Sequence, residues 1–217
     1  MQRLLGSFAL LAILALVVGA PHPLAAQVTL GINGGFVSST FYGSDADETE
    51  SESGFNIGAS LGIPFGSGRV ALSPGVYWVQ KGSGVVLDGI DGSFSTAYLE
   101  IPVLLSVGLT SPESSTAFRI FGGPQVSFET ACDVSATDGS VTLEASCDDA
   151  EIVERNTVDF GLVFGAMVGF PLGERIQLQL SGGADFGFQT LDAEDDPWDI
   201  RNRSFFVNAG LAFPLGG

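Results

Sequence analysis

Three carboxylates, Glu100, Asp159 and Asp185, stand at polar positions of segments whose alternate residues are apolar. Alternate residues of an extended chain point to opposite sides, so these acids share the side opposite the apolar residues. On neighbouring strands they could bind a small cation or a polar solute. The interpretation that we favour is a hydrogen-bonded polar plug in which Glu100 pairs with a base, because buried carboxylates need such partners. The basic residues expected on this side are Lys81, Arg119 and Arg175.

The sequence gives little support for catalysis. Its one histidine, His22, lies in a segment that we expect to be removed, which excludes histidine-based triads, metal sites and acid–base schemes in the mature chain. Carboxylate pairs within the acidic runs have no fixed separation and therefore do not indicate hydrolysis. We predict no enzyme, no catalytic residue, no metal site and no cofactor.

The two cysteines, Cys132 and Cys147, lie in one acidic stretch between alternating segments. We expect the protein to be exported, on the basis of its N-terminal segment described below, and export leads to an oxidising compartment. A disulfide is therefore the simplest expectation, and two free thiols are the alternative. Closing a loop of about 15 residues constrains the unfolded chain by roughly 3 kcal/mol in the entropic model. We expect the bond to hold a long loop compact.

Acidic residues dominate the connecting segments. The chain has 25 Asp and Glu against eight Lys and Arg, which argues against nucleic acid as a partner because phosphates would be repelled. The runs "DADETESES" (45–53) and "DAEDDPWD" (192–199) could bind calcium, but neither has the spacing of a known calcium loop. A solvated acidic surface is the interpretation that we favour.

The first 26 residues form a separate unit. A short basic start at Arg3, an apolar run from Leu4 to Ala20 and small residues before Gln27 are typical of a secretory signal peptide, with cleavage after Ala26. An uncleaved anchor helix is the alternative. Residues 27–217 are then one domain, in which no later stretch approaches the roughly 18 apolar residues of a spanning helix.

Eight segments of the remaining chain alternate with period two, which predicts β-strands with one apolar face. The connections between them alternate in length, with "GSG", "TSPESST" and "PLGE" at one end and long acidic stretches at the other. Short turns at one end and long loops at the other are typical of outer-membrane barrels. The predicted fifth strand could be bulged at "GGP" (122–124). The predicted apolar faces span 28–36, 55–65, 70–78, 97–107, 118–128, 158–170, 176–188 and 205–213.

Aromatic residues gather near both ends of these apolar faces, for example Phe36 and Phe205 at one end and Phe65 and Phe213 at the other. Two aromatic belts with aliphatic residues between them match the two membrane interfaces. A secreted soluble β-domain is the alternative, although it gives no reason for aromatics at both rims. We predict an all-β, eight-stranded antiparallel up-and-down transmembrane barrel with short periplasmic turns and long acidic extracellular loops, closed by the first and last strands.

Four segments resemble the PorT-like or "porin family" outer-membrane β-barrels of Bacteroidetes: "YLEIPVLL" (98–105), "FGGPQVSF" (121–128), "DFGLVFGAMVGF" (159–170) and "RSFFVNAGLAF" (203–213). The resemblance covers about residues 27–215 and implies a small barrel in the outer membrane, inserted by the barrel-assembly machinery. Most members of the family have no established activity, and one branch is associated with protein secretion.

The expected function is therefore a monomeric scaffold in outer-membrane lipid that presents acidic extracellular loops to an extracellular or secretion-system protein. Two alternatives stay open. One is a narrow channel or a binder of small polar solutes or cations, and the other is an accessory subunit of an outer-membrane secretion system.

Overall fold

The computed structural model describes residues 27–46, 49–87, 90–111, 114–138, 140–149, 155–173, 175–191 and 198–215. The predicted signal peptide, residues 1–26, lies outside this range. Within it, no helix is long and apolar enough to span a membrane.

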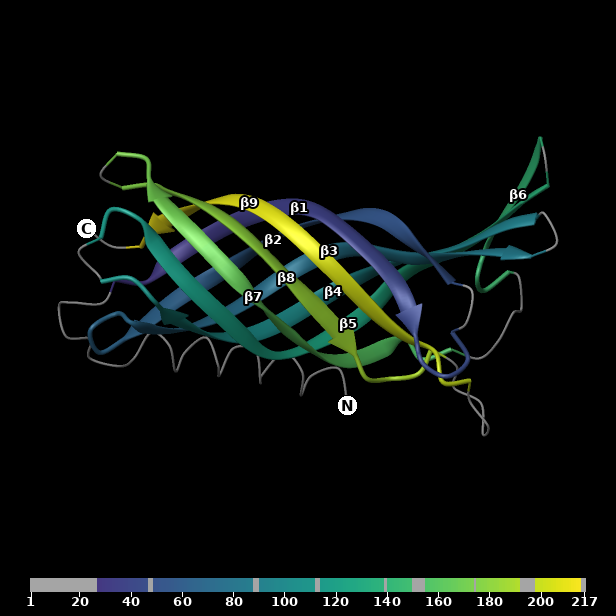
Figure 1. The fold of residues 1–217 in the computed structure, drawn as a ribbon, viewed down its shortest axis with the longest axis horizontal. Coiled ribbons are helices and arrows are strands. Elements are labelled where there is room, and N and C mark those ends of the chain that lie inside the picture. The colour runs from purple at the N-terminus through teal and green to yellow at the C-terminus, as the bar shows by residue number, and fades with distance from the viewer. Residues whose placement is uncertain are drawn as a thin grey trace, which may run out of the picture.

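The described chain is built from antiparallel strands that close into a ring (Figure 1). Every neighbour along the ring pairs antiparallel, and the ring closes because β1 pairs with β9 and β4 pairs with β5. One further strand, β6, pairs with β5 alone and is not part of the ring. The strands are β1 (Thr29–Tyr42), β2 (Thr49–Phe65), β3 (Val70–Leu87), β4 (Ile90–Gly108), β5 (Ala117–Asp138), β6 (Val141–Ser146), β7 (Val158–Pro171), β8 (Gln177–Gly187) and β9 (Arg201–Pro214).

The prediction of a closed eight-stranded barrel is thus confirmed, including the seam between its first and last strands. Closure matters because an open sheet edge in hydrocarbon leaves unpaired N–H and C=O groups that cost several kcal/mol each. The β1–β9 register runs from Thr29↔Pro214 to Tyr42↔Arg201, so the seam is paired along the whole of β1.

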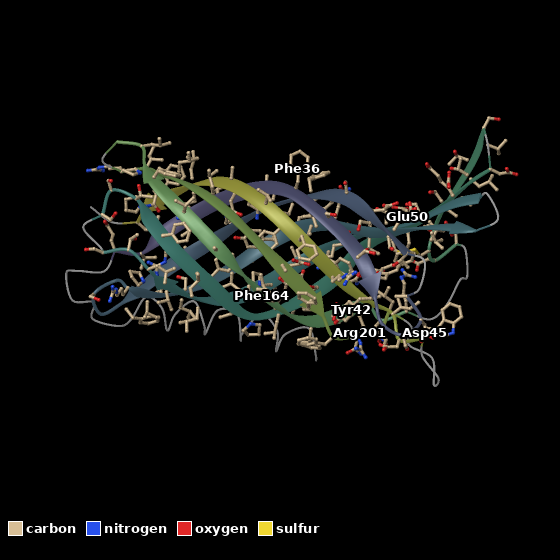
Figure 2. All side chains as sticks on the ribbon, viewed as in Figure 1. Phe36, Tyr42, Asp45, Glu50, Phe164 and Arg201 are labelled. Atoms are coloured by element: carbon tan, nitrogen blue, oxygen red, sulfur yellow. A yellow bond between two sulfur atoms is a disulfide. The ribbon has the colours of Figure 1, made fainter. Side chains whose placement is uncertain are left out.

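The apolar faces point outward, as predicted. Phe36 is 79% exposed and Val207 is 70% exposed, and Figure 2 draws Phe36 pointing away from the barrel. A soluble barrel would leave such side chains in water, whereas acyl chains solvate them without cost. Belt residues at both ends are exposed in the same way: Phe55, Phe128, Phe188 and Phe205 near one end and Phe65, Phe118 and Phe170 near the other.

The two ends of the barrel differ. The β2–β3, β4–β5 and β7–β8 connections lie at one end, where glycines with positive φ, Gly66, Gly68 and Gly173, form tight turns. Figure 1 shows the end of β9 at this end, and β6 at the opposite one. By the usual asymmetry of these barrels, the short-turn end is periplasmic and the β6 end is extracellular.

Two expectations about irregular segments are wrong. The β5–β7 register is unbroken from Ala117↔Gly169 to Phe128↔Val158, so "GGP" carries no bulge. The register shift of β5 lies instead at Thr130, which is skipped between the pairs Tyr98↔Glu129 and Ala97↔Ala131. The alternation of inward and outward residues continues through this stretch, because the outward side carries Gly122, Pro124 and Val126.

The second wrong expectation concerns two of the predicted long loops, those after β3 and within 131–153, which are largely strand. β3 runs on to Leu87, β4 begins at Ile90 and β5 continues to Asp138, beyond which β6 folds back. β5 has 22 residues, while a tilted membrane-spanning strand needs about 9–11. We call residues 82–87, 90–96, 131–138 and 141–146 of β3, β4, β5 and β6 the projecting sheet, which extends beyond the barrel in Figure 1.

Candidate functional site

A buried charge cluster crosses the lumen. Lys81 of β3 lies between Glu100 of β4 and Asp185 of β8, with its Nζ 2.6 Å from Glu100 Oε1 and in hydrogen-bond contact with Asp185 Oδ2. The exposed fractions of the three residues are only 4%, 6% and 4%. Burial removes water from three charges at once, so each charge depends on the others for stabilisation.

Neutral side chains complete the cluster. Gln125 donates to Asp185 Oδ2 over 3.2 Å, and Ser204 donates to the same oxygen over 3.5 Å. The Lys81 ammonium lies 5.7 Å from the centre of the Tyr98 ring, and Asn202 donates to the Tyr98 hydroxyl over 3.2 Å. The cluster therefore connects strands on opposite sides of the ring, β3 and β4 with β8 and β9.

The structure brings together two of the three predicted carboxylates. Glu100 and Asp185 share Lys81, while Asp159 accepts instead from the backbone N–H groups of Phe188 and Gln189, over 3.2 and 2.9 Å. These bonds fix the extracellular end of β8 to β7. The centre of the predicted cation site is thus occupied by the chain's own ammonium group.

The two arginines predicted on the lumen side lie in different places. Arg119 points inward at the periplasmic end, where its guanidinium donates to Ser106 and to the backbone carbonyls of Gly68 and Arg69. The predicted position of Arg175 on the lumen side is wrong, because Arg175 is exposed in the β7–β8 turn. The predicted strand began at Ile176, and the register of β8 begins one residue later, at Gln177.

A second ion-pair group lies at the extracellular rim. Arg155, which the sequence did not single out, donates to Glu129 and to Asp148 over 2.8 Å each. Partial burial of Arg155 disfavours its charge, but the bonds to Asp148 and Glu129 outweigh that effect and raise its pKa. Arg155 comes from a long predicted loop, where no periodicity could have placed it against an inward Glu129.

The disulfide is present as predicted. Cys132 of β5 bonds to Cys147, just after β6, with Cα atoms 5.4 Å apart, and the Cys147 N–H donates to the Cys132 carbonyl over 3.0 Å. The β5–β6 register runs from Asp133↔Ser146 to Asp138↔Val141. The bond therefore cross-links the two strands of the β5–β6 hairpin at its base.

The projecting sheet has an apolar face and an acidic face. One row across its four strands is Ser83, Phe94, Val134 and Ala145, and the next is Val85, Gly92, Ala136 and Leu143. These rows continue the lumen side of the barrel, since Lys81 pairs with Thr96 in the same alternation. The opposite face carries the exposed acids Asp91, Asp133 and Glu144.

The acidic runs reach the same end of the barrel. Figure 2 shows Asp45, Glu50 and Arg201 at the end where β1 finishes and β2 begins. Arg201 pairs with Asp199 over 2.8 Å. In the part of the chain that the structure describes, no three metal-ligating side chains form a cluster. The segments 47–48 and 192–197 of the two runs lie outside the described residues.

The ring of eight strands, its apolar outer surface and its charged lumen define a small transmembrane β-barrel of the outer membrane. Residues 17–193 match the family described as "Outer membrane protein beta-barrel domain", and the chain belongs to that family. Its place is accordingly the outer membrane.

Solved structures of outer-membrane barrels are similar to the chain, and no curated protein sequence matches it. Neisserial surface protein A is 12% identical with a TM-score of 0.48, covering 87% of this chain and 97% of its own. The outer membrane protein OprG from Pseudomonas aeruginosa is 12% identical with a TM-score of 0.49, covering 88% and 98%. A major outer membrane protein from Thermus thermophilus is 11% identical with a TM-score of 0.47, covering 87% and 99%.

Proposed function

We propose that this protein is a monomeric, non-enzymatic scaffold in outer-membrane lipid that binds an extracellular or secretion-system protein through its projecting sheet. The observation that carries the proposal is the unpaired edge of β6. Among the described residues, β6 pairs only with β5, so its other edge presents backbone donors and acceptors. An extended partner segment can add a strand to such an edge.

The register indicates which β6 groups are available. Because the Cys147 N–H donates to Cys132, alternation in an antiparallel pair directs the N–H groups of residues 141, 143 and 145 toward β5. The N–H groups of Thr142 and Glu144 then point away from β5, toward a partner. Val141 and Leu143 are 60% and 71% exposed, so the side chains beside this edge are accessible too.

The two faces of the projecting sheet indicate which types of residue should alternate along the partner strand. A strand added to β6 continues its rows, with one set of side chains beside Leu143 and the alternate set beside Glu144. Apolar residues fit the first face. Lys or Arg fits the second, where Asp133 and Glu144 are diagonal neighbours on adjacent strands and Arg155 is already paired with Glu129 and Asp148. The partner segment is therefore an extended strand in which basic and apolar residues alternate.

In this proposal the charge cluster in the lumen has a structural role and does not line a channel. The cluster of Lys81, Glu100 and Asp185 crosses the lumen at one level, and an eight-stranded barrel is narrow enough for such a cluster to close it there. The narrow-channel alternative predicts conductance in planar bilayers that changes with Glu100→Gln. We further propose the PorT-like branch for this chain, on the strength of the segment "YLEIPVLL".

The test uses the full chain in lipid nanodiscs and a synthetic ten-residue peptide of alternating Lys and Val as the probe. We expect saturable binding, and no binding of the alternating Glu–Val peptide. Thr142→Pro removes an outward N–H and blocks a new strand while leaving the backbone bonds to β5 in place, so it should abolish binding. Thr142→Val should preserve binding, and it is the matched control because both variants lose the hydroxyl contact with Thr137.

A charge-matched pair of variants separates specific docking from general attraction. Asp133→Asn/Glu144→Gln should weaken binding about tenfold, equivalent to roughly 1.4 kcal/mol. Glu50→Gln/Glu52→Gln removes the same charge from β2 and should leave binding unchanged. Equal effects of both pairs, or undiminished binding by Thr142→Pro, would overturn the proposed docking.

A further inference from the structure

The periplasmic half of the lumen is hollow. A cavity of about 360 Å³ extends from Gln27 and Gly68 at the periplasmic rim to Glu100 and Asp185 at the charge cluster. Gln27 is exposed, so the cavity reaches the rim. Its volume falls within the roughly 300–1,000 Å³ of small-molecule sites. The cluster separates this cavity from the extracellular half.

The wall offers many neutral hydrogen-bonding groups, and one of them is buried without a partner. Asn56 is 7% exposed and donates to Asn208 over 2.9 Å, but its own Oδ1 accepts no hydrogen bond. Such an acceptor gains from a ligand N–H or O–H donor. The other neutral polar residues that line the cavity are Thr29, Asn33, Ser60, Ser73, Tyr77, Gln177, Gln179 and Ser181.

The inner end of the cavity carries two carboxyl groups and a single ammonium group. Glu100 and Asp185 share that group, which belongs to Lys81. Arg119 at the rim does not supply a second cation there, because its guanidinium is directed to Ser106 and to the carbonyls of the β2–β3 turn. A second ammonium group would find two carboxylates at the end of the cavity.

Aromatic rings form an apolar part of the wall. Phe121 and Phe206 lie with ring centres 6.5 Å apart and nearly parallel, and both line the cavity together with Tyr77. Two glycines make room for these rings. A Cβ at Gly165 would lie 2.7 Å from Phe121 Cζ, and one at Gly183 would lie 2.7 Å from Phe206 Cζ. Rings of this kind suit the C–H faces and the cationic groups of a ligand.

We propose that this cavity binds a small primary-ammonium compound rich in hydroxyl groups, of the size of an amino sugar, which enters from the periplasmic rim. The ammonium group lies at Glu100 and Asp185, a hydroxyl donates to Asn56 Oδ1, and the carbon skeleton lies against Phe121 and Phe206. The site is separate from the β6 edge, so either proposal can fail without the other.

The test follows the methyl NMR signal of Met167 in the full chain, in detergent micelles, during titration with glucosamine. Met167 lines the cavity and is one of only two methionines in the sequence, and Met167→Leu assigns its signal. We expect a saturable shift with glucosamine. Glucose lacks the ammonium group, and glucuronate carries a negative charge instead, so both should bind at least about tenfold more weakly.

Variants test the proposed contacts. Glu100→Gln should weaken glucosamine binding about tenfold, and Asn56→Ala about threefold to tenfold. Glu129→Gln is the matched control, because Glu129 is also a shielded inward carboxylate but pairs with Arg155 outside the cavity, and it should bind as the parent does. Heat-modifiable gel migration verifies that each variant folds. No saturable shift with the parent chain, equal binding of glucose, or unchanged binding by folded Glu100→Gln and Asn56→Ala would overturn the proposal.

Discussion

The extracellular and periplasmic halves of this barrel use the same alternating strands for different purposes. At the extracellular half, charged side chains fill the lumen and β3, β4 and β5 continue into the projecting sheet. At the periplasmic half, glycine turns end the strands directly and the lumen holds a 360 Å³ cavity. The difference shows that the membrane sets only the minimum strand length, while the inward residues decide whether a section of the barrel is filled or hollow.

The apolar residues of β5 face outward in its barrel part and inward in the projecting sheet. On β5, Phe118 and Phe128 belong to the lipid-facing belts, whereas beyond the bulge at Thr130 the apolar residue Val134 lies on the side that continues the lumen. One inserted residue therefore moves the apolar face from the outside of the barrel to the inside of the projecting sheet. The predictions below test this division, beginning with the largest expected effect.

Removing the cation of the lumen cluster should have the largest effect. Lys81→Met leaves Glu100 and Asp185 buried without an ammonium group and should destabilise the barrel by about 3–5 kcal/mol. Urea unfolding followed by gel migration measures the loss. The triple variant Lys81→Met/Glu100→Gln/Asp185→Asn should recover most of the stability. A Lys81→Met barrel as stable as the parent would contradict the structural role of the cluster.

A charge placed on two equally apolar surfaces should distinguish lipid from water. Leu162 is 45% exposed near the middle of β7, and Leu143 is 71% exposed on β6. Leu162→Arg should cost about 2–4 kcal/mol of unfolding free energy in lipid vesicles, the usual cost of arginine near the bilayer midplane. Leu143→Arg should change it by less than about 0.5 kcal/mol. Similar losses at both sites would mean that they contact the same medium.

The disulfide should matter only for the projecting sheet. Cys132→Ser/Cys147→Ser removes a cross-link between residues 15 apart, worth roughly 3 kcal/mol in the entropic model. We expect faster hydrogen exchange at the β6 amides and unchanged exchange in β7 and β8. Loss of heat-modifiable migration by this variant would show that the barrel itself depends on the bond.

The smallest predicted effect is the difference in unfolding free energy between variants of Arg119 and Arg175. Arg119→Met removes hydrogen bonds that join β5 to Ser106 and to the β2–β3 turn, and should cost about 1 kcal/mol. Arg175→Met alters an exposed turn residue and should stay within about 0.5 kcal/mol of the parent. The urea midpoints of unfolding of the two variants measure these losses. A larger loss for Arg175→Met than for Arg119→Met would contradict the prediction.

Alternation alone was enough to predict the eight barrel strands, because lipid imposes one apolar face on every strand. It also placed Lys81, Glu100, Asp185 and Arg119 on the inward side. It could not predict which carboxylates meet, since contact across a lumen depends on tilt and stagger around the whole ring. Arg175 was misplaced because it lies two residues before β8 begins, where alternation has no meaning.

The projecting sheet was missed although the sequence carries a signal for it. Val134 and Ala136 precede an Asp138–Gly139 pair and Val141 and Leu143 follow it, and Asp–Gly between alternating segments indicates a hairpin. The abundance of acidic and small residues favoured a loop instead. Arg155 had no comparable signal, because its contacts with Glu129 and Asp148 arise from tertiary structure alone.

Tryptophan quenching tests the central claim most directly, namely that the outward apolar face contacts acyl chains while the β6 end lies in water. The sequence has two tryptophans: Trp78, on the outward side of β3 against Phe55, and Trp198, 63% exposed before β9. In vesicles with brominated acyl chains, the fluorescence of Trp198→Phe, which retains Trp78, should be strongly quenched and should resist aqueous iodide. The variant Trp78→Phe, which retains Trp198, should show the reverse. Quenching of Trp78 by iodide and not by brominated lipid would contradict the transmembrane barrel.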